Sequence, residues 1–514
     1  MSATSKAQQC TPREAFVEAN KTYASLVDEL RSEKAQRMTH SEIESLICER
    51  GNELMRRLLQ GYLDSLGAGP ATAAVRNQDG VELKHRVEEG RNLESVFGTV
   101  RIVREGCRQG EVPAVYPLDA RLNLPARKYS LGVERKSALE ALKSSFSEAI
   151  RTVTEYTGAC VPRRQLEEIA VRAAVDFDAF YEHQPVVPPE QTGPLLALSV
   201  DGKGIVMRTE DLREATRKAA EQREHKLTAR LSSGEKRNCK RMAEVAAVYT
   251  IQPHLRKPED IISKLRPAGG KRVAPKPENK RVWASVEKDA EDVIAEVFQE
   301  ALRRDPRQEK TWIGLVDGNR DQLRVFKRLA KRYGVALFLV VDYIHALEYM
   351  WKAARALHGD TPGAEDWVLD RAFKLLQGKV SDVAAGIRRS ATLQGLEGNA
   401  REVVDTCCNF LLNNAAYMKY DICLRKGYPI ATGVIEGACR HLVNERLGIS
   451  GARWGLMRAE AILKLRSLYL SGDFEEYWKF HEQREFARNH ATRYFKGRVP
   501  KVEILSRSHL RVLK

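Results

Sequence analysis

Apolar side chains near the N-terminus recur three and four positions apart, which is the spacing of one face of an α-helix. The pattern covers two segments, Phe16–Arg37 and Ser41–Leu66, and predicts a helix in each. We expect Ser41 to cap the second helix, with Glu44 at the position that completes a capping box. Farther along, LESVFGTVRIVRE alternates apolar and polar residues around a glycine. That alternation predicts a short β-hairpin.

A second pair of periodic segments follows in AIRTVTEYTGACVPRRQLEEIAVRAA. Gly158 stands at the break, and Pro162 falls near the first turn of the second segment, where a proline is tolerated. This arrangement resembles a helix-turn-helix, in which the front of the second helix reads bases in the major groove. Arg163, Arg164 and Gln165 occupy that position, so we expect them to bind DNA. An ordinary helical hairpin is the alternative.

Three apolar runs of strand length in the middle of the chain each end on an aspartate. They are LLALSVDG with Asp201, TWIGLVDG with Asp317 and VALFLVVD with Asp342. MAEVAAVYTI is typical of a further strand, and GIVMRT of a hairpin partner for the first run. Helices are predicted near Ala284–Arg303 and in DQLRVFKRLAKRYG. The alternation predicts an α/β fold with a mixed sheet flanked by helices.

The segment from Tyr343 to about Leu424 shows only the helical period. A further helix is predicted after the break at Gly433, running through GACRHLVNERLG, and the segment from GLMRAEAILKLR to EQREF is helical too. The tail from Ala491 onward is basic, and we expect it to be partly disordered.

Charge narrows the range of partners. The 514 residues include 85 Lys and Arg against 69 Asp and Glu, a formal net charge of +16. A surplus of this size favours a polyanionic partner, nucleic acid first and an anionic membrane second, although a solvated basic surface would also account for it. The length allows roughly three or four domains.

The lengths of the apolar runs and the spacing of the cysteines indicate the cellular compartment in which we expect the protein. No segment approaches the about 20 continuous apolar residues of a membrane helix, and the N-terminus lacks the apolar core of a signal peptide. Nine cysteines are scattered along the chain without a CxxC pair. Reduced thiols in the cytoplasm fit this pattern, and we expect neither a structural zinc nor a membrane partner.

Asp201 and Asp317 share one local setting, because each ends an apolar run and precedes a glycine. Acids at the ends of neighbouring strands would converge and repel each other unless a cation neutralised them. Mg²⁺ or Mn²⁺ is the natural occupant of a site made only of oxygen ligands. Asp-Gly is also a common turn signal, which is the structural alternative for either residue.

A third acid, Glu436, begins a helix in TGVIEGACRHLVNERLG. Two divalent ions held by three carboxylates could activate a water or a 3′-hydroxyl and stabilise the departing oxygen of a phosphodiester. Helical spacing places Arg440 about one turn beyond Glu436, where it could contact a phosphate. A glutamate at a helix start also complements the helix dipole, which is the alternative for Glu436.

Five blocks of the sequence together resemble the ISKra family of bacterial insertion-sequence transposases, which are distant relatives of the Mutator-like group. The blocks are LALSVDGKG, RMAEVAAVYTIQPHLRKPED, WIGLVDGNRDQL, VVDYIHALEYMWKAARAL and the long segment from GVIEGACRH to DFEEYW. The resemblance implies an RNase H-like core with a DDE triad, interrupted by an all-helical insertion before the final glutamate. It supports Asp201, Asp317 and Glu436 as the metal ligands.

The same resemblance matches Asp342 and His345, in DYIH, to an Asp/Cys-x-x-His element between the second and third acids. Asp342 therefore competes with Asp317 as second ligand. We prefer Asp317, because it would end the fourth strand of an RNase H-like order and Asp342 the fifth. Asp342 and His345 then line the site, or else form a hydrogen-bonded pair that anchors a helix start. The family's cysteine pair near the hairpin is reduced here to Cys107, which argues against zinc.

These patterns divide the chain into a helical region, a linker with a β-hairpin module, a helix-turn-helix-like DNA-binding domain, the first part of the core, a helical insertion, the final core helices and a basic tail. The corresponding residues are 1–70, 71–125, 126–190, 191–342, 343–430, 431–490 and 491–514. The sequence predicts a transposase that acts on double-stranded DNA as a homo-oligomer, a dimer at least. Arg320 and Arg453 complete the expected DNA contacts. An inactive DNA-binding relative and a nuclease without strand transfer are the alternatives.

Overall fold

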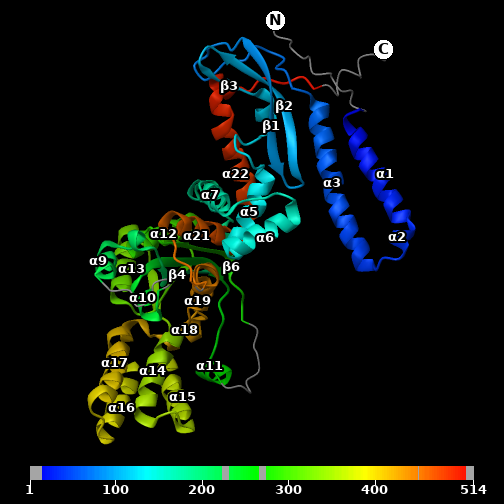
Figure 1. The fold of residues 1–514 in the computed structure, drawn as a ribbon. Coiled ribbons are helices and arrows are strands. Elements are labelled where there is room, and N and C mark those ends of the chain that lie inside the picture. The colour runs from blue at the N-terminus through cyan, green and yellow to red at the C-terminus, as the bar shows by residue number, and fades with distance from the viewer. Residues whose placement is uncertain (1–13, 223–230, 266–273, 450, 505–514) are drawn as a thin grey trace. The chain divides into compact units, whose positions relative to one another are not determined.

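The computed structural model describes residues 14–222, 231–265, 274–449 and 451–504. The chain forms two compact units (Figure 1). The first unit combines residues 1–182 with residues 474–514, and the second comprises residues 183–473. Within the described ranges, no helix combines the length and the apolar character needed to cross a bilayer.

The first unit begins with a helical hairpin, as the periodicity predicts. Its helices are α1 (Val17–Arg31), α2 (Glu33–Gln36) and α3 (His40–Leu66). The predicted cap at Ser41 is wrong by two positions. Thr39 caps α3, and its backbone N–H donates to Glu42 at 2.7 Å, which completes the capping box. Thr39 is the N-cap residue because its backbone is extended, whereas Ser41 already lies inside the helix.

A three-stranded antiparallel sheet follows (Figure 1). Its strands are β1 (His85–Ser95), β2 (Gly98–Gln109) and β3 (Val112–Val115). The predicted hairpin is present and is longer than its apolar alternation indicated, because the charged residues from His85 onward also pair. Leu59 and Leu63 of α3 pack against Leu93, Val100 and Ile102, so the sheet and α3 share one core.

Short helices continue the first unit. They are α4 (Pro117–Arg121), α5 (Leu131–Lys143), α6 (Phe146–Thr157), α7 (Arg163–Ala173) and α8 (Phe177–His183). Gly158 ends α6 with a φ of +59°, a left-handed conformation that glycine adopts without strain. Pro162 then holds an extended backbone immediately before α7. The two predicted helices and the break between them are therefore confirmed.

Helix α22 (Phe474–Asn489) belongs to the first unit, and our boundary after residue 490 is wrong. Buried charges hold it there. His481 and Arg488 both bond the carboxylate of Asp176, at 2.8 and 2.7 Å. Arg127 joins Glu485 to buried Glu134. Periodicity along α22 predicted the helix but not the residues that it binds, because those residues lie some 300 positions earlier in the sequence.

The expected disorder after Ala491 is also corrected for the residues that the structure describes. Tyr494 is 2% exposed and packs with Val75, Leu83, Cys107 and Val115. An aromatic ring buried against the β-sheet fixes this part of a segment that its charge alone made us expect to be disordered. The remainder of the predicted tail, residues 505–514, lies outside the described residues.

The second unit contains a five-stranded mixed sheet in the order β6-β5-β4-β7-β8. The strands are β4 (Leu195–Val206), β5 (Lys240–Ile251), β6 (Glu278–Ser285), β7 (Thr311–Val316) and β8 (Leu337–Val341). β4, β5 and β6 pair antiparallel, whereas β7 and β8 run parallel to β4. This mixed α/β arrangement is consistent with the predicted RNase H-like core.

GIVMRT is not a hairpin partner of β4, as we predicted, but largely its continuation. β4 runs on through Asp201 to Val206, and all of it pairs with β5. Glycines at 202 and 204 gave the appearance of a turn in the sequence. The pairing with β5 prevails because twelve consecutive residues find partners on that strand.

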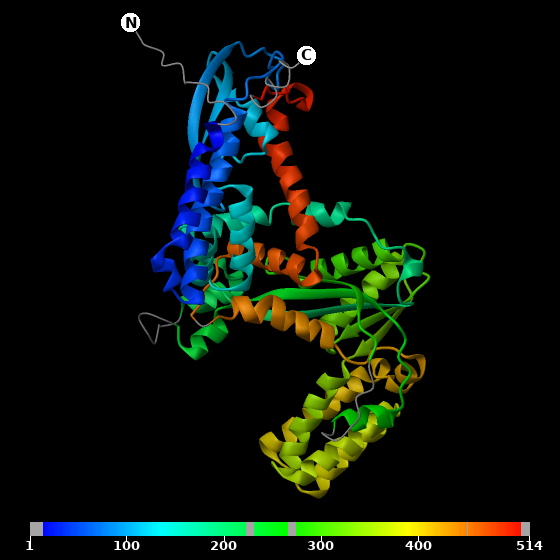
Figure 2. The same cartoon turned by 90° about the vertical axis from the view of Figure 1, so that its right-hand side faces the viewer.

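Helices lie on both faces of this sheet (Figure 2). They include α12 (Ala290–Arg304) and α13 (Arg320–Tyr333), and the short helices α9 (Glu214–Glu221) and α10 (Ser233–Asn238) precede them in the chain. Helix α11 (Pro258–Leu265) packs against α15 (Pro362–Leu376) instead. Trp283 of β6 donates its indole N–H to Glu296 of α12. Parts of the charged stretch after Glu210 and of the Pro-rich loop, residues 223–230 and 266–273, lie outside the described residues.

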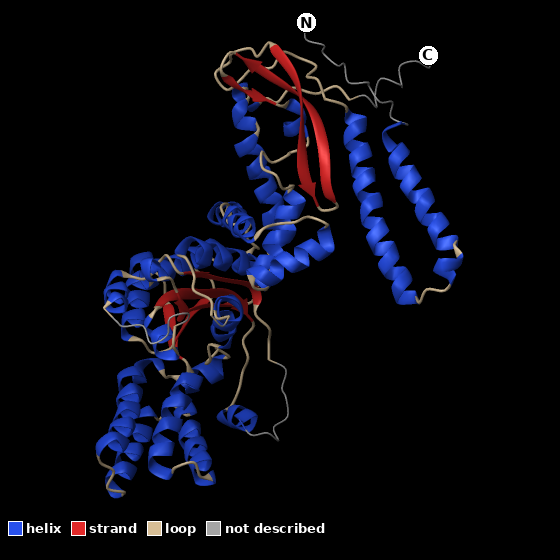
Figure 3. Ribbon diagram, in the orientation of Figure 1, coloured by secondary structure: helices blue, strands red, loops and turns tan. Residues whose placement is uncertain are grey.

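The chain from Tyr343 to Lys426 is helical, as predicted (Figure 3). Its helices are α14 (Tyr343–His358), α15 (Pro362–Leu376), α16 (Val380–Leu393), α17 (Gly398–Asn414) and α18 (Tyr420–Lys426). The chain then returns to the sheet. There it forms α19 (Gly433–Ala438), the π-helix η5 (Cys439–Asn444), α20 (Glu445–Leu447) and α21 (Leu456–Ser471).

Asp176→Ala should destabilise the first unit by about 3 kcal/mol, because it leaves buried His481 and the guanidinium of Arg488 without their shared anion. Hydrogen exchange of α22 peptides along a urea titration measures this. Asp178→Ala, at an exposed position two residues farther on in α8, is the matched control and should shift the transition little. Equal transitions for both variants would show that the Asp176 cluster does not hold α22.

Candidate functional site

Three acids stand at one level of three neighbouring strands. Ser199 of β4 pairs with Leu315 of β7, and Asp201 and Asp317 each lie two residues farther on. Val316 of β7 pairs with Val341 of β8, and Asp342 lies one residue beyond Val341. Because parallel strands are about 4.8 Å apart, Asp317 has Asp201 on one side and Asp342 on the other.

Asp201 does not end its strand, contrary to the prediction, but it lies where the parallel partner of β4 ends. Its side chain is half-buried. The backbone N–H of Gly202 donates to Oδ1 at 2.7 Å, and the thiol of Cys439 donates to Oδ2 at 3.2 Å. Each carboxylate oxygen therefore has one donor that fixes its direction and keeps a lone pair for another partner.

Asp317 is also half-buried and follows β7 directly. Its Oδ1 accepts the backbone N–H of Asn319 at 2.9 Å, and Asn319 in turn caps α13. Gly318 has a φ of +92°, and a Cβ there would lie 2.9 Å from the ring of Phe410. The loop that presents Asp317 therefore depends on a glycine at 318, both for its conformation and for space.

Asp342 has a different setting, since its side chain is buried and its oxygens are already bonded. Oδ1 caps α14 through the backbone N–H of Ile344 at 2.7 Å. Oδ2 accepts the hydroxyl of Thr432 and its backbone N–H. His345 does not complete the hydrogen-bonded pair that we considered. It lies against Glu348, with 3.4 Å between Nδ1 and Oε2, and edge-on to the rings of Tyr349 and Phe410.

Glu436 lies in the first turn of α19, which packs on β4, β5 and β6. The hydroxyl oxygen of Thr432 is 3.4 Å from its Oε1. Partial burial raises the pKa of Glu436, and the nearby charge of Asp342 raises it further. Glu348 and Asp201 add to this effect. The helix thus brings its carboxylate close to the acids of the sheet.

Negative charge accumulates at this end of the sheet. Burial and the charge of Asp201 also raise the pKa of Glu244 on β5, which is half-buried. Among the described residues, no group of three or more His, Cys, Asp or Glu side chains is close enough to enclose a metal ion. The donor chemistry nevertheless suits a hard divalent cation, because the charges of neighbouring aspartates raise the pKa of Glu436 and Glu244, and such a cation would relieve this repulsion.

Sequence reasoning missed two residues at this site. Thr432 contacts both Asp342 and Glu436. Its position directly before the start of a helix was the feature of the sequence that could have indicated a hydrogen-bonding role. Cys439 contacts Asp201, and its position three residues after Glu436 places it on the same helical face. Burial and the neighbouring charge of Asp201 raise the pKa of the Cys439 thiol. His441 contacts Glu445 instead.

The predicted DNA-contacting residues fall in both units. Arg163 and Arg164 are exposed at the start of α7 and pair with Glu167 and Glu168 of the next turn, while Gln165 also bonds Glu168. In the second unit, the predicted residues are all exposed, and they are Arg320, Arg440 and Arg453. Arg440 reaches toward Glu445 at 3.7 Å. The second-unit arginines therefore lie at the start of α13, within η5 and after α20.

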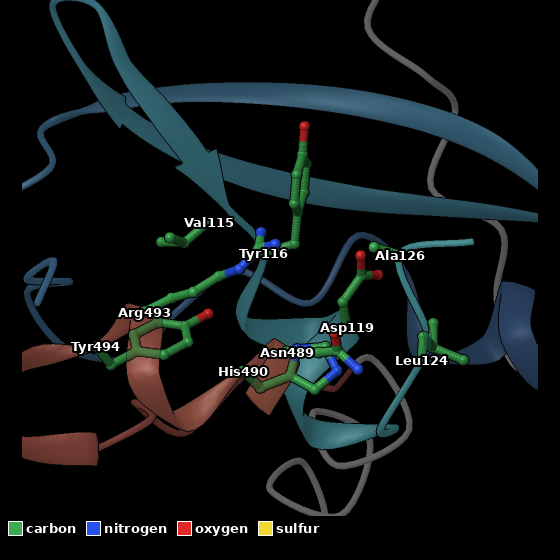
Figure 4. A pocket seen from close by; sticks show the side chains of 9 residues that line it. All are labelled: Val115, Tyr116, Asp119, Leu124, Ala126, Asn489, His490, Arg493 and Tyr494. Atoms are coloured by element: carbon green, nitrogen blue, oxygen red, sulfur yellow. The ribbon is translucent and has the colours of Figure 1, made fainter. Parts of the chain in front are cut away.

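A small polar cavity lies in the first unit between β3 and α22 (Figure 4). Its volume is about 30 Å³, and Tyr116, Asp119, His490 and Arg493 contribute to its walls. Burial lowers the pKa of His490 to about 4. The cavity has room for a single water and none for a nucleotide. We therefore assign it to the packing of this unit and place the candidate site at the acids of the second.

No protein-family model matches the chain, and no curated protein sequence matches it. Among solved structures, a Drosophila P element transposase strand transfer complex is similar over 71% of this chain and 83% of that chain. The sequence identity is 10% and the TM-score is 0.24. A TM-score this low does not establish a shared fold, so the function of this chain has to be inferred from its own residues.

Proposed function

We propose that this protein is a DDE transposase that cuts and joins DNA at the ends of an insertion sequence. The observation that carries the proposal is the level register of Asp201 and Asp317 on adjacent parallel strands, with Glu436 on a helix packed against the same sheet. Asp201 and Asp317 are level on neighbouring strands, and the charge of Asp201 reaches Glu436. A set of acids that repel one another costs stability, and a cation-dependent reaction is a reason to keep it.

Asp201, Asp317 and Glu436 would hold two Mg²⁺ or Mn²⁺ ions. When bound, the ions would activate a water or 3′-hydroxyl and stabilise the departing oxygen of the phosphodiester. Asp317 is the better second ligand, because its carboxylate is half-exposed and only one of its oxygens accepts a protein hydrogen bond in the contacts described above. Asp342, which is buried and bonded at both oxygens, positions Thr432 and the start of α14 instead.

The remaining chain supplies DNA binding. The exposed front of α7, with Arg163, Arg164 and Gln165, is suited to the major groove of the end sequence. Arg320, Arg440 and Arg453 would contact phosphates close to the reacting bond. The helical segment 343–430 would be an insertion in the core, and two transposon ends would require a homo-oligomer, a dimer at least.

Two other functions use the same residues. A DNA-binding relative without catalysis is disfavoured by the presence of all three acids. A nuclease of the same site would cut DNA without joining it. A target plasmid added to the reaction separates this outcome from transposition, because strand transfer joins end DNA covalently to the plasmid.

The catalytic variants Asp201→Asn, Asp317→Asn and Glu436→Gln should lower cleavage of end DNA by at least about a thousandfold, since each removes a charge that holds the ions. Binding to the same DNA should change little. The substrate is a duplex carrying the inverted repeats that flank the coding sequence, and gel analysis of cut strands gives the rate. Asp321→Asn, an exposed acid four residues from Asp317, is the matched control.

The outcome for Asp342→Asn decides the second ligand. Asparagine keeps the helix cap, so the fold should survive and cleavage should persist at a reduced rate. If Asp317→Asn cuts normally and Asp342→Asn is inactive, Asp342 is the second ligand. Normal cleavage by Asp201→Asn would refute the proposed site altogether.

Replacing Arg163 and Arg164 together by alanine should weaken binding to end DNA by about 10- to 100-fold, because each arginine contributes about 1 kcal/mol or more. Fluorescence anisotropy over a salt series measures both the affinity and its salt dependence. Arg151→Ala on α6 is the matched control, since Arg151 is exposed and paired with Glu148 in the same way. Equal affinities for the double variant and the control would exclude the front of α7 from the DNA contact.

A further inference from the structure

The thiol of Cys439 joins the helix that carries Glu436 to the strand that carries Asp201. Its sulfur lies 3.2 Å from Oδ2 of Asp201, and the side chain is 5% exposed. A buried cysteine usually fills apolar space. Here it contacts a carboxylate that the proposed function places on the metal, so its role is tied to that carboxylate.

The backbone around Cys439 departs from regular helix at this point. The π-helix η5 starts at Cys439, and such wide turns inside α-helices are frequent at functional sites. Buried Arg466 of α21 donates to the carbonyl oxygens of Leu442 at 2.9 Å and of His441. A buried arginine thus satisfies carbonyls of the widened turn and holds it in place. The hydrogen bonds from Arg466 therefore stabilise the irregular turn, and Cys439 is its first residue.

The two carboxylate oxygens of Asp201 are each held by a donor from a different element of the structure. Gly202 donates to Oδ1 from the backbone of the same strand, which fixes that oxygen relative to β4 alone. Cys439 donates to Oδ2 from a different element, three residues after Glu436. Removal of the thiol would leave Oδ1 held by Gly202 but would release the contact that sets the position of Oδ2 relative to the helix of Glu436.

We propose that Cys439 is a positioning residue whose S–H hydrogen bond holds the Asp201 carboxylate in register with Glu436 for cation binding. The inference rests on the proposed function, since it assumes that Asp201 and Glu436 bind the same pair of ions. Residues that hydrogen-bond a metal ligand change metal affinity by about 10- to 100-fold when they are mutated. The proposal therefore concerns cation affinity more than the saturated rate.

Three variants separate the hydrogen bond from the volume of the sulfur. Cys439→Ala removes the donor, and Cys439→Ser keeps a donor in a side chain of similar length. Cys408→Ala is the matched control, because Cys408 is a fully buried cysteine on α17 whose thiol donates to the carbonyl oxygen of Ala384. Two quantities are measured for each: the Mg²⁺ concentration at half-maximal cleavage, and Mn²⁺ binding to the full chain without DNA, by electron paramagnetic resonance.

Cys439→Ala should raise the half-maximal Mg²⁺ concentration about tenfold or more and weaken Mn²⁺ binding to a similar extent, with a small effect on the saturated rate. Cys439→Ser and Cys408→Ala should remain close to the wild type. Unchanged cation affinity in Cys439→Ala would overturn the inference. An equal loss in Cys439→Ser would also overturn it, because the serine retains the donor.

The Mn²⁺ measurement distinguishes the inference from the proposed function. Wild-type protein that binds Mn²⁺ without cutting DNA would contradict the proposed activity, while Cys439→Ala would still test the positioning role. Wild-type protein that neither cuts DNA nor binds Mn²⁺, with Asp201→Asn indistinguishable from it, would overturn both.

Discussion

Parallel pairing of β4, β7 and β8 is the constraint on which the candidate site depends. Hydrogen bonding between strands sets which residues are level, and it places Asp201, Asp317 and Asp342 in one row. Side-chain packing alone could not do this, because a shift by one residue would turn a carboxylate to the other face of the sheet. The acids converge because apolar strands before them, such as TWIGLV, are buried and cannot slip without exposing their side chains.

The convergence has an electrostatic cost that the surrounding residues offset in different ways. Asp342 adds to the repulsion at Glu436, and the start of α14 and Thr432 stabilise its charge by bonding its oxygens. Asp201 has one donor on each oxygen, whereas Glu436 has a raised pKa and lies in a partly exposed turn. The acids that keep exposed oxygens are those best suited to bind a cation. Buried and fully bonded Asp342 is suited to hold the others in position.

Local pattern was enough to predict most elements and the three apolar strands that lead to Asp201, Asp317 and Asp342, since periodicity and apolar runs are properties of neighbouring residues. Local pattern failed where residues far away in the sequence determine how long an element is or what it packs against. The continuation of β4 past Asp201 depends on β5, about 40 positions away by register, and the place of α22 depends on Asp176. The thiol contact between Cys439 and Asp201 joins residues 238 positions apart, so no spacing rule could have revealed it. The metal ligands and DNA contacts themselves remain predictions.

The first unit is assembled from both ends of the chain, residues 1–182 and 474–514. During translation its early helices and sheet leave the ribosome long before α22 does. Buried Asp176 is then made without its partners His481 and Arg488, which follow only after nearly 300 residues of the second unit. A prematurely terminated product would therefore lack a finished first unit, even though it contained the whole of α7. The unit that we propose binds DNA can therefore be completed only after α22 has been synthesised.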